Sequence, residues 1–206
     1  MLSDLELERY ARHIVLKEIG GPGQAQLKAS HVAIVGVGGL GAPVALYLAA
    51  AGIGRLTLID DDKVSLSNLQ RQVIYQTAEV GEPKVACAAR HLRALNDEIT
   101  VIPLADRLDR TNATALLGGA NVICDGSDGF ATRHAVNEAA VRLKVPIVSG
   151  ALGSFSAQLA VFAGFERETP CYQCFVPAGA IAVQRSCADE GIIGALAGVV
   201  GALQAL

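Results

Sequence analysis

The sequence predicts an α/β protein with a doubly wound, mostly parallel sheet and an N-terminal helical segment. Short apolar runs rich in branched residues alternate with segments of helical periodicity along most of the 206 residues. A glycine-rich turn, GVGGLG at 36–41, separates the first apolar run from the first long helix. Because parallel strands need helical crossovers, this alternation favours a Rossmann-like sheet.

The expected elements follow one another in regular order. A strand at 32–35 precedes the glycine turn, and a helix at 42–51 follows it, with Pro43 in its first turn and Gly52 at its end. Further strands are expected at 55–60, 99–104, 121–125, 146–150 and 157–162, and further helices at 83–96, 111–117 and 130–143. Ligands of such sheets bind beyond the carboxyl ends of the strands, so polar residues there are the first site candidates.

Composition limits the classes of protein. A chain of 206 residues suits one well-buried domain, and 17 basic against 20 acidic residues give no basic face for nucleic acid. Mean hydropathy is high, at +0.39. Residues 32–54 are uncharged and long enough for a membrane span, but six glycines and Pro43 argue against one. The uncharged segment 191–206 is expected to be a core or subunit-interface helix.

The glycine turn matches the pattern G-x-G-x-x-G between a strand and a helix. Gly36 would allow the tight turn, Gly38 would let a phosphate approach the backbone, and Gly41 would permit close helix packing. Packing alone is the structural alternative. Asp60, at the end of the next strand, could hold the ribose of NAD or of ATP, so the turn predicts a nucleotide without choosing between them.

Three consecutive carboxylates, Asp60, Asp61 and Asp62, follow that strand. Adjacent carboxylates repel one another, so the arrangement requires a cation or a hydrogen-bond donor unless the side chains simply splay into water. We expect Asp62 to face a metal or Arg71, and Asp61 to point to solvent.

Two basic residues favour a polyphosphate over a dinucleotide. Lys84 follows Pro83 and is predicted in the first turn of a helix, where the macrodipole disfavours a cation by roughly 0.3–1 kcal/mol. Either a polyphosphate or the neighbouring Glu82 would compensate that charge. Arg71 lies in the polar segment SNLQRQ. A triphosphate with Mg²⁺ would use both cations, whereas a dehydrogenase has no evident need for them.

Asp128 lies in CDGSDG, just after the fourth predicted strand. Its carboxylate could cap the next helix together with Asp125 and Ser127, or bind a metal that bridges phosphates. Because the first, second and fourth strands would direct their carboxyl ends at one crevice, its position favours metal binding.

Taken together, these motifs resemble one family. The segments RYARHIVL at 9–16, LIDDDKVSLSNLQRQ at 58–72, VGEPK, CDGSD and CYQC, with the glycine turn, are similar to the ubiquitin-activating-type adenylyltransferases. The nearest resemblance is to bacterial activators of sulfur-carrier proteins in the molybdopterin and thiamine pathways, and it covers nearly the whole chain. It implies a single ATP-binding domain that adenylates the C-terminal Gly-Gly carboxylate of a small ubiquitin-like sulfur carrier and releases pyrophosphate.

The resemblance also implies roles for single residues. Asp60 would hold the ribose, Asn68 and Arg71 would bind phosphate, Lys84 would neutralise charge during transfer, and Asp128 would bind Mg²⁺. The implied nucleotide contacts are Gly38, Gly39, Gly41, Asp60, Ser67, Asn68, Leu69, Gln70, Arg71, Lys84, Asp128 and Gly129. Relatives often have asparagine at the last of these positions, so a side-chain contact is not expected there.

Arg12 has a separate implied role. In the family an arginine at this position reaches the site from the partner subunit, which implies a homodimer. A surface arginine on an amphipathic helix is the structural alternative.

The cysteines divide into three groups. Five cysteines without a signal-peptide pattern indicate a reducing, cytoplasmic setting. Cys87 and Cys124 are predicted in the core. Cys187 lies near Arg185, which could lower its thiol pKa. Some relatives have a cysteine in this region that forms a thioester or persulfide, and an ordinary loop cysteine is the alternative.

Cys171 and Cys174 have the C-x-x-C spacing of half a tetrahedral zinc site. Relatives supply a second such pair further along, whereas this chain ends at Leu206. We therefore expect a shortened form that holds zinc weakly or not at all, with the loop 171–185 mobile. A disulfide between the two cysteines and a zinc shared across a dimer are the alternatives.

Two other classes of function remain open. An NAD-dependent oxidoreductase would use the same glycine turn and Asp60, and a non-catalytic dimeric scaffold would keep the fold without turnover. The set Asp60, Arg71, Lys84 and Asp128 argues against the scaffold. Neither nucleic acid nor a membrane is expected as a partner.

Overall fold

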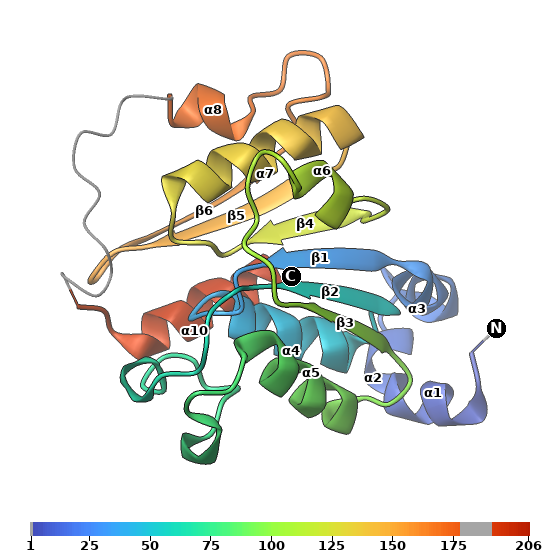
Figure 1. The fold of residues 1–206 in the computed structure, drawn as a ribbon. Helices are drawn as coiled ribbons and strands as arrows, with labels where there is room; N and C mark the ends of the chain where they lie inside the picture. The colour runs from blue at the N-terminus through green and yellow to red at the C-terminus, as the bar shows by residue number, and fades with distance from the viewer. Residues whose placement is uncertain (1, 178–190) are drawn as a thin grey trace.

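The computed structural model describes residues 2–177 and 191–206 and confirms the predicted fold class. One six-stranded sheet has the order β3-β2-β1-β4-β5-β6 (Figure 1). The strands are β1 (His31–Val35), β2 (Arg55–Ile59), β3 (Thr100–Leu104), β4 (Val122–Asp125), β5 (Ile147–Leu152) and β6 (Ala157–Phe162). All neighbouring strands pair in parallel except β6, which pairs antiparallel with β5.

Helices cover both faces of the sheet (Figure 1). On one face lie α4 (Gly41–Ala51), α5 (Lys84–Leu95) and α10 (Gly194–Gln204), and on the other lie α6 (Ala113–Leu116), α7 (Phe130–Leu143) and α8 (Tyr172–Phe175). Each face has its own buried apolar cluster. The N-terminal segment forms α1 (Asp4–Arg9), α2 (Ala11–Ile14) and α3 (Gly20–Ala29), and two 3₁₀ turns, η1 (Leu66–Asn68) and η2 (Thr77–Glu79), follow β2.

The strand order reverses next to β1. From β1 the chain proceeds outward through β2 and β3, then returns to place β4 on the other side of β1 and continues to β5. Every residue of β1 is buried, as expected for a central strand covered by helices on both faces. The carboxyl ends of β1 and β4 therefore flank a topological switch point, the usual ligand position in such sheets.

Most predicted boundaries agree with the structure to within two or three residues. Helix α4 ends with Gly52 as its C-cap, which has a left-handed φ of 83°, as expected for a glycine in this position. Pro83 occupies the N-cap position of α5, so that Lys84 is the first helical residue. The segment 191–206 becomes helical only from Gly194, and α10 packs on α4, β5 and β6. Within residues 2–177 and 191–206, no helix is long and apolar enough to cross a bilayer.

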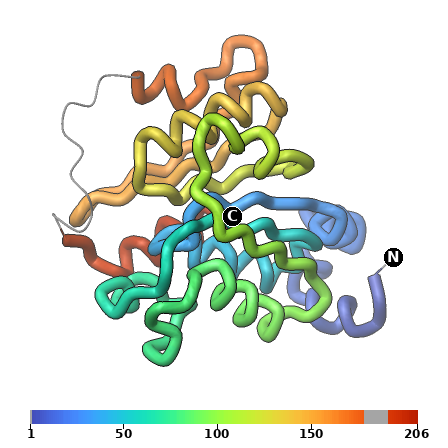
Figure 2. Tube along the Cα trace, viewed as in Figure 1, coloured from blue at the N-terminus to red at the C-terminus, as the bar shows by residue number. Residues whose placement is uncertain are grey.

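The polar segment between β2 and α5 folds back toward the sheet edge. Figure 2 traces this segment, coloured teal, beside α10. The two segments meet at Gly194, where an added Cβ would lie 2.2 Å from the carbonyl oxygen of Gln70. The first turn of α10 therefore helps to hold this polar segment in place.

Candidate nucleotide-binding site

The glycine turn has the tight geometry that its motif predicts. Gly36 has a φ of +79°, which side-chain-bearing residues rarely adopt. A Cβ added to Gly41 would lie 1.8 Å from the carbonyl oxygen of Gly36, so a side chain cannot be accommodated there. The two glycines let the chain reverse and begin α4 directly beyond β1.

Asp60 holds this turn in place. Its Oδ2 accepts a hydrogen bond of 2.7 Å from the N–H of Val37, and its Oδ1 accepts one of 2.9 Å from the N–H of Asp62. Burial raises the pKa of the Asp60 carboxyl, although the positive charge of Lys84 acts in the opposite direction. Each carboxylate oxygen has a further lone pair, so Asp60 could still accept hydrogen bonds from the hydroxyl groups of a ribose.

Tyr75 contacts the same turn from the protein interior. Its hydroxyl donates a hydrogen bond of 2.7 Å to the carbonyl oxygen of Val37, and only 6% of the residue is exposed. Burial, assisted by the negative charge of Asp60, raises the tyrosine pKa, so the hydroxyl remains a donor. No sequence motif predicted a role for Tyr75. An aromatic residue three positions after the polar segment SNLQRQ is the signal that could have found it.

The turn presents unused donors. Among the described residues, the N–H groups of Gly38 and Gly39 have no hydrogen-bond acceptor. They precede the N-terminus of α4, which has no side-chain cap. Exposed N–H groups and the positive end of a helix dipole together favour an anion such as phosphate.

Arg71 is brought to the turn by η1. Its guanidinium donates to Asn68 Oδ1 at 3.1 Å and to the carbonyl oxygen of Ser67 at 3.2 Å. Its aliphatic part runs along the glycine turn, since a Cβ added to Gly39 would lie 3.5 Å from Arg71 Cγ. The structure thus unites the predicted residues 67–71 with the turn, and the side chain of Leu69 packs against the core.

Lys84 has a partner that the sequence analysis did not assign to it. Its side chain is 4% exposed, and its Nζ lies 2.8 Å from Asp62 Oδ2. The alternative pairing with Glu82 is wrong, because Glu82 lies 3.2 Å from Arg90 instead. Asp61 is exposed, as expected. Asp62 therefore faces Lys84 rather than Arg71, since the loop after β2 passes directly over the first turn of α5.

Asp128 follows β4 in a loop held by its neighbours. The Oδ1 of Asp125 accepts hydrogen bonds from the N–H of Ser127 at 3.0 Å and from its hydroxyl at 2.7 Å. Helix α7 begins after Gly129, which provides no side-chain cap, so the shared capping proposed for Asp125 and Ser127 is wrong. The hydrogen bonds between Ser127 and Asp125 therefore fix the conformation of the loop before α7 begins.

A buried arginine ties this loop to β5. Arg133, on α7 and 6% exposed, donates to the carbonyl oxygens of Ser127 and of Gly150, the latter at 2.7 Å. Its Nη1 also lies 3.4 Å from Ser149 Oγ. No sequence motif predicted a role for Arg133, although a charged residue among the apolar positions of the predicted helix at 130–143 was a signal for it. It fixes the backbone immediately before Asp128.

Arg12 lies away from the glycine turn of its own chain. It is exposed on α2. The preceding Tyr10 packs on Gly52, where an added Cβ would be 2.5 Å from the tyrosine ring. Gly52 ends α4, and a helix of 11 residues is about 16 Å long. Arg12 is thus near the opposite end of α4 from the turn.

The cysteines agree in part with expectation. Cys87 and Cys124 are buried, and burial raises the pKa of their thiols to about 11 and about 12, so neither is an activated nucleophile. Cys187 and Arg185 lie outside the described residues.

The C-x-x-C pair lies at the start of α8. The sulfur atoms of Cys171 and Cys174 are 3.6 Å apart, with both thiols free. Burial would raise the pKa of the Cys171 thiol, but hydrogen bonds from the Cys174 backbone and the Asn137 side chain outweigh it and lower the pKa. The segment is docked on α7, where Asn137 Oδ1 accepts from the N–H of Tyr172 at 2.8 Å. Of the loop expected to be mobile, only 171–177 is described.

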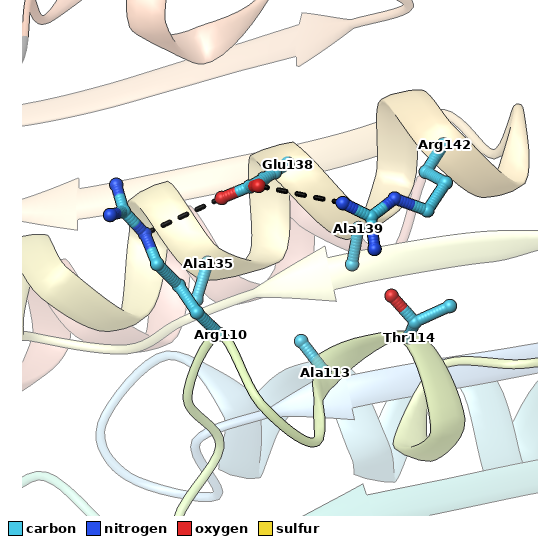
Figure 3. A pocket seen from close by; sticks show the side chains of 7 residues that line it. All are labelled: Arg110, Ala113, Thr114, Ala135, Glu138, Ala139 and Arg142. Carbon is cyan, nitrogen blue, oxygen red and sulfur yellow. Dashed lines mark ion pairs between the residues drawn. The ribbon is translucent and has the colours of Figure 1, made fainter.

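Two other features lie outside this arrangement or overlap it only in part. Within the described ranges, Asp60, Asp61 and Asp62 form the one group of three or more acidic, histidine or cysteine side chains whose ligand atoms lie within 4.8 Å of one another. A surface hollow lies between α6 and α7 (Figure 3). Beside it, Glu138 pairs with Arg110 at 3.4 Å and, along α7, with Arg142 at 3.5 Å. The hollow is on the face opposite α4, so it is separate from the glycine turn.

Fold and edge geometry together define a Rossmann-type α/β protein with a glycine turn suited to phosphate. The chain belongs to the ThiF family, whose model matches residues 10–206.

Named relatives agree with this assignment. The chain is 42% identical over 205 residues to the SAMP-activating enzyme E1 of Haloferax volcanii, covering 99% of this chain and 75% of that protein. It is 44% identical over 207 residues to the sulfur carrier protein adenylyltransferase of Thermus thermophilus, covering 97% and 75%. A solved structure of E. coli MccB with MccA-N7isoASN has a TM-score of 0.81 at 28% identity, covering 96% of this chain and 62% of that one.

Proposed function

We propose that this chain is an adenylyltransferase that uses ATP to activate the C-terminal Gly-Gly carboxylate of a small ubiquitin-like sulfur-carrier protein. The observation that carries the proposal is the convergence of Lys84, Arg71 and the unused N–H groups of the glycine turn at one sheet edge. These groups supply the positive charge and donors that a triphosphate requires. The names of the relatives support the reaction and the class of acceptor.

In the proposed reaction, a carboxylate oxygen of the carrier attacks the α-phosphorus of ATP. A carboxyl–phosphate bond forms, the bond to the β-phosphate oxygen breaks, and pyrophosphate leaves with the electron pair. Asp60 would orient the ribose, Asn68 and Arg71 would bind phosphate oxygens, and Lys84 would stabilise the charge that develops at phosphorus.

Mg²⁺ fits the donors at this edge. Asp128 is exposed in the loop after β4, and carboxylate oxygens are the ligands that Mg²⁺ prefers. The ion would neutralise phosphate charge, with Asp128 as its protein ligand. Arg133 supports that role by holding the carbonyl of the preceding residue.

The competing functions are not favoured. An NAD-dependent oxidoreductase would share Asp60 and the glycine turn, but it would leave the buried Lys84 and Arg71 without a triphosphate. The relatives at 42% and 44% identity carry the names of activating and adenylyltransferase enzymes, which also disfavours a non-catalytic scaffold.

Pyrophosphate exchange tests the proposed reaction. Labelled pyrophosphate should enter ATP only when the chain, Mg²⁺ and a carrier ending in Gly-Gly are all present. The matched control is the same carrier without its last glycine, which should give no exchange. Absence of exchange with every Gly-Gly carrier, or binding of NADH but not ATP, would overturn the proposal.

A homodimer is part of the proposal. The position of Arg12, at the far end of α4 from its own glycine turn, supports a role in the site of a partner subunit. Four described cysteines with free thiols support a reducing, cytoplasmic setting.

Two cysteine functions remain proposals. Cys187 would attack the carbonyl carbon of the carrier's acyl-adenylate, so that a thioester forms and AMP leaves. Because this step follows adenylation, Cys187→Ala should keep pyrophosphate exchange. Cys171 and Cys174, with sulfurs 3.6 Å apart, suit half of a zinc site. With these two ligands alone we expect weak zinc binding or none, and one tightly held zinc per subunit by metal analysis would contradict this.

A further inference from the structure

Both backbone polar groups of Val37 are held by side chains from other parts of the chain. Its N–H donates to Asp60 at 2.7 Å, and its carbonyl accepts from the Tyr75 hydroxyl at 2.7 Å. Val37 is fully buried. It lies between two glycines, Gly36 and Gly38, whose backbones are the most free to rotate. The two side chains therefore restrain a peptide that its neighbours would otherwise leave mobile.

The Tyr75 bond has a consequence at Gly38. The carbonyl of Val37 and the N–H of Gly38 belong to one planar trans peptide, so they point in opposite directions. Because the hydroxyl draws the carbonyl toward the core, the N–H of Gly38 is directed away from Tyr75. That N–H has no acceptor in residues 2–177 and 191–206, so it is available to a ligand.

We propose that Tyr75 is a positioning residue that directs the N–H of Gly38 at a phosphate of the bound nucleotide, an inference that rests on the proposed function. Tyr75 does not contact the nucleotide, because its hydroxyl is engaged by Val37. Without the hydroxyl, the buried carbonyl of Val37 loses its donor and the peptide can rotate toward water. A rotated peptide presents a carbonyl oxygen, which repels phosphate, in place of an N–H.

The variant Tyr75→Phe tests this inference, because it removes only the hydroxyl. By calorimetric titration without carrier, Mg-ATP should bind about threefold to tenfold more weakly, the range expected for one net hydrogen bond. Adenosine, which has no phosphate, should bind the variant and the wild type equally. A general loss of site structure would instead weaken both ligands.

Tyr10→Phe is the matched control. Tyr10 is 4% exposed, and its hydroxyl accepts a hydrogen bond of 2.8 Å from Asn96 near the opposite end of α4. Loss of the Tyr10 hydroxyl should lower the melting temperature about as much as loss of the Tyr75 hydroxyl does. It should leave the affinity for Mg-ATP unchanged.

The outcomes separate the two proposals. If the wild type binds Mg-ATP and Tyr75→Phe binds it equally well, or loses ATP and adenosine affinity alike, the role of Tyr75 is overturned and the proposed function stands. If the wild type binds no Mg-ATP, the proposed function fails, and this inference fails with it. Should Tyr75→Phe not fold, NMR of the wild type decides. The Gly38 amide proton must shift downfield with Mg-ATP but not with adenosine.

Discussion

Lys84 Nζ lies 2.8 Å from Asp62 Oδ2, in a pair whose lysine is 4% exposed and whose aspartate is 69% exposed. The pair explains why three carboxylates follow β2. Asp60 accepts a hydrogen bond from the backbone of the glycine turn, Asp62 pairs with Lys84 at the start of α5, and Asp61 is exposed to solvent. The exposed Asp62 side chain can rotate away from the pair, whereas the buried Lys84 side chain cannot. A phosphate could therefore take the place of Asp62 without moving Lys84.

Asp62→Asn should destabilise the nucleotide-free protein by about 1–2 kcal/mol, because it leaves a buried ammonium without its carboxylate while solvent screens part of the loss. Mg-ATP should reduce this difference, since phosphate supplies the missing charge. Melting temperatures with and without Mg-ATP measure the effect. Asp61→Asn is the matched control and should change little, and equal losses in the two variants would contradict the prediction.

Lys84→Ala and Asp128→Ala should each reduce carrier-dependent pyrophosphate exchange by about 100-fold or more, since each removes charge that stabilises the transition state. Circular dichroism should show that both variants remain folded. Lys63→Ala, at an exposed lysine of the loop after β2, is the control and should exchange normally. Retained exchange in both site variants would rule out the roles assigned to them.

Arg12→Ala and Lys84→Ala subunits, each inactive alone, should recover partial activity when mixed. A mixed dimer would rebuild one complete site if Arg12 acts in the partner subunit. Exchange activity before and after mixing measures the recovery, and subunit exchange is shown independently by mass spectrometry. If subunits exchange without recovery, Arg12 acts in its own subunit or not at all.

Glu79 should make stability depend on acid pH. Burial raises the pKa of its carboxyl, but hydrogen bonds from Arg90, Gln76 and His91 outweigh burial and hold the pKa below the ordinary value of 4.5. The unfolded chain therefore takes up the proton first as pH falls. The stabilisation is complete above pH 4.5 and is lost as pH falls from there through the folded-state pKa.

Glu79→Gln should lower the free energy of unfolding by about 1–2 kcal/mol at neutral pH, and its difference from the wild type should narrow below pH 4.5. Urea unfolding at a series of pH values measures both effects. Glu82→Gln is the control, because Glu82 is 47% exposed and bonds to the same Arg90 at the longer distance of 3.2 Å. A constant difference at every pH would exclude the assigned linkage.

The sequence by itself determined the features that depend on neighbouring residues. Alternating apolar runs predicted the sheet and its crossovers, Gly36 and Gly41 predicted the turn, and Pro83 predicted that Lys84 lies in the first turn of α5. Each follows from local backbone geometry or helix chemistry, which a short stretch of chain already contains. The shared edge of Asp60 and Asp128 followed from the parallel strand order that this alternation implies.

Only the tertiary structure decided which side chains meet. The choice of Asp62 over Glu82 for Lys84, the Tyr75 hydroxyl on Val37, and the Arg133 link to β5 all join residues that are distant in sequence. Such partners depend on how loops cross the sheet edge and on the register of packed helices. Local patterns do not carry that information, because the same residue preferences are compatible with many loop paths.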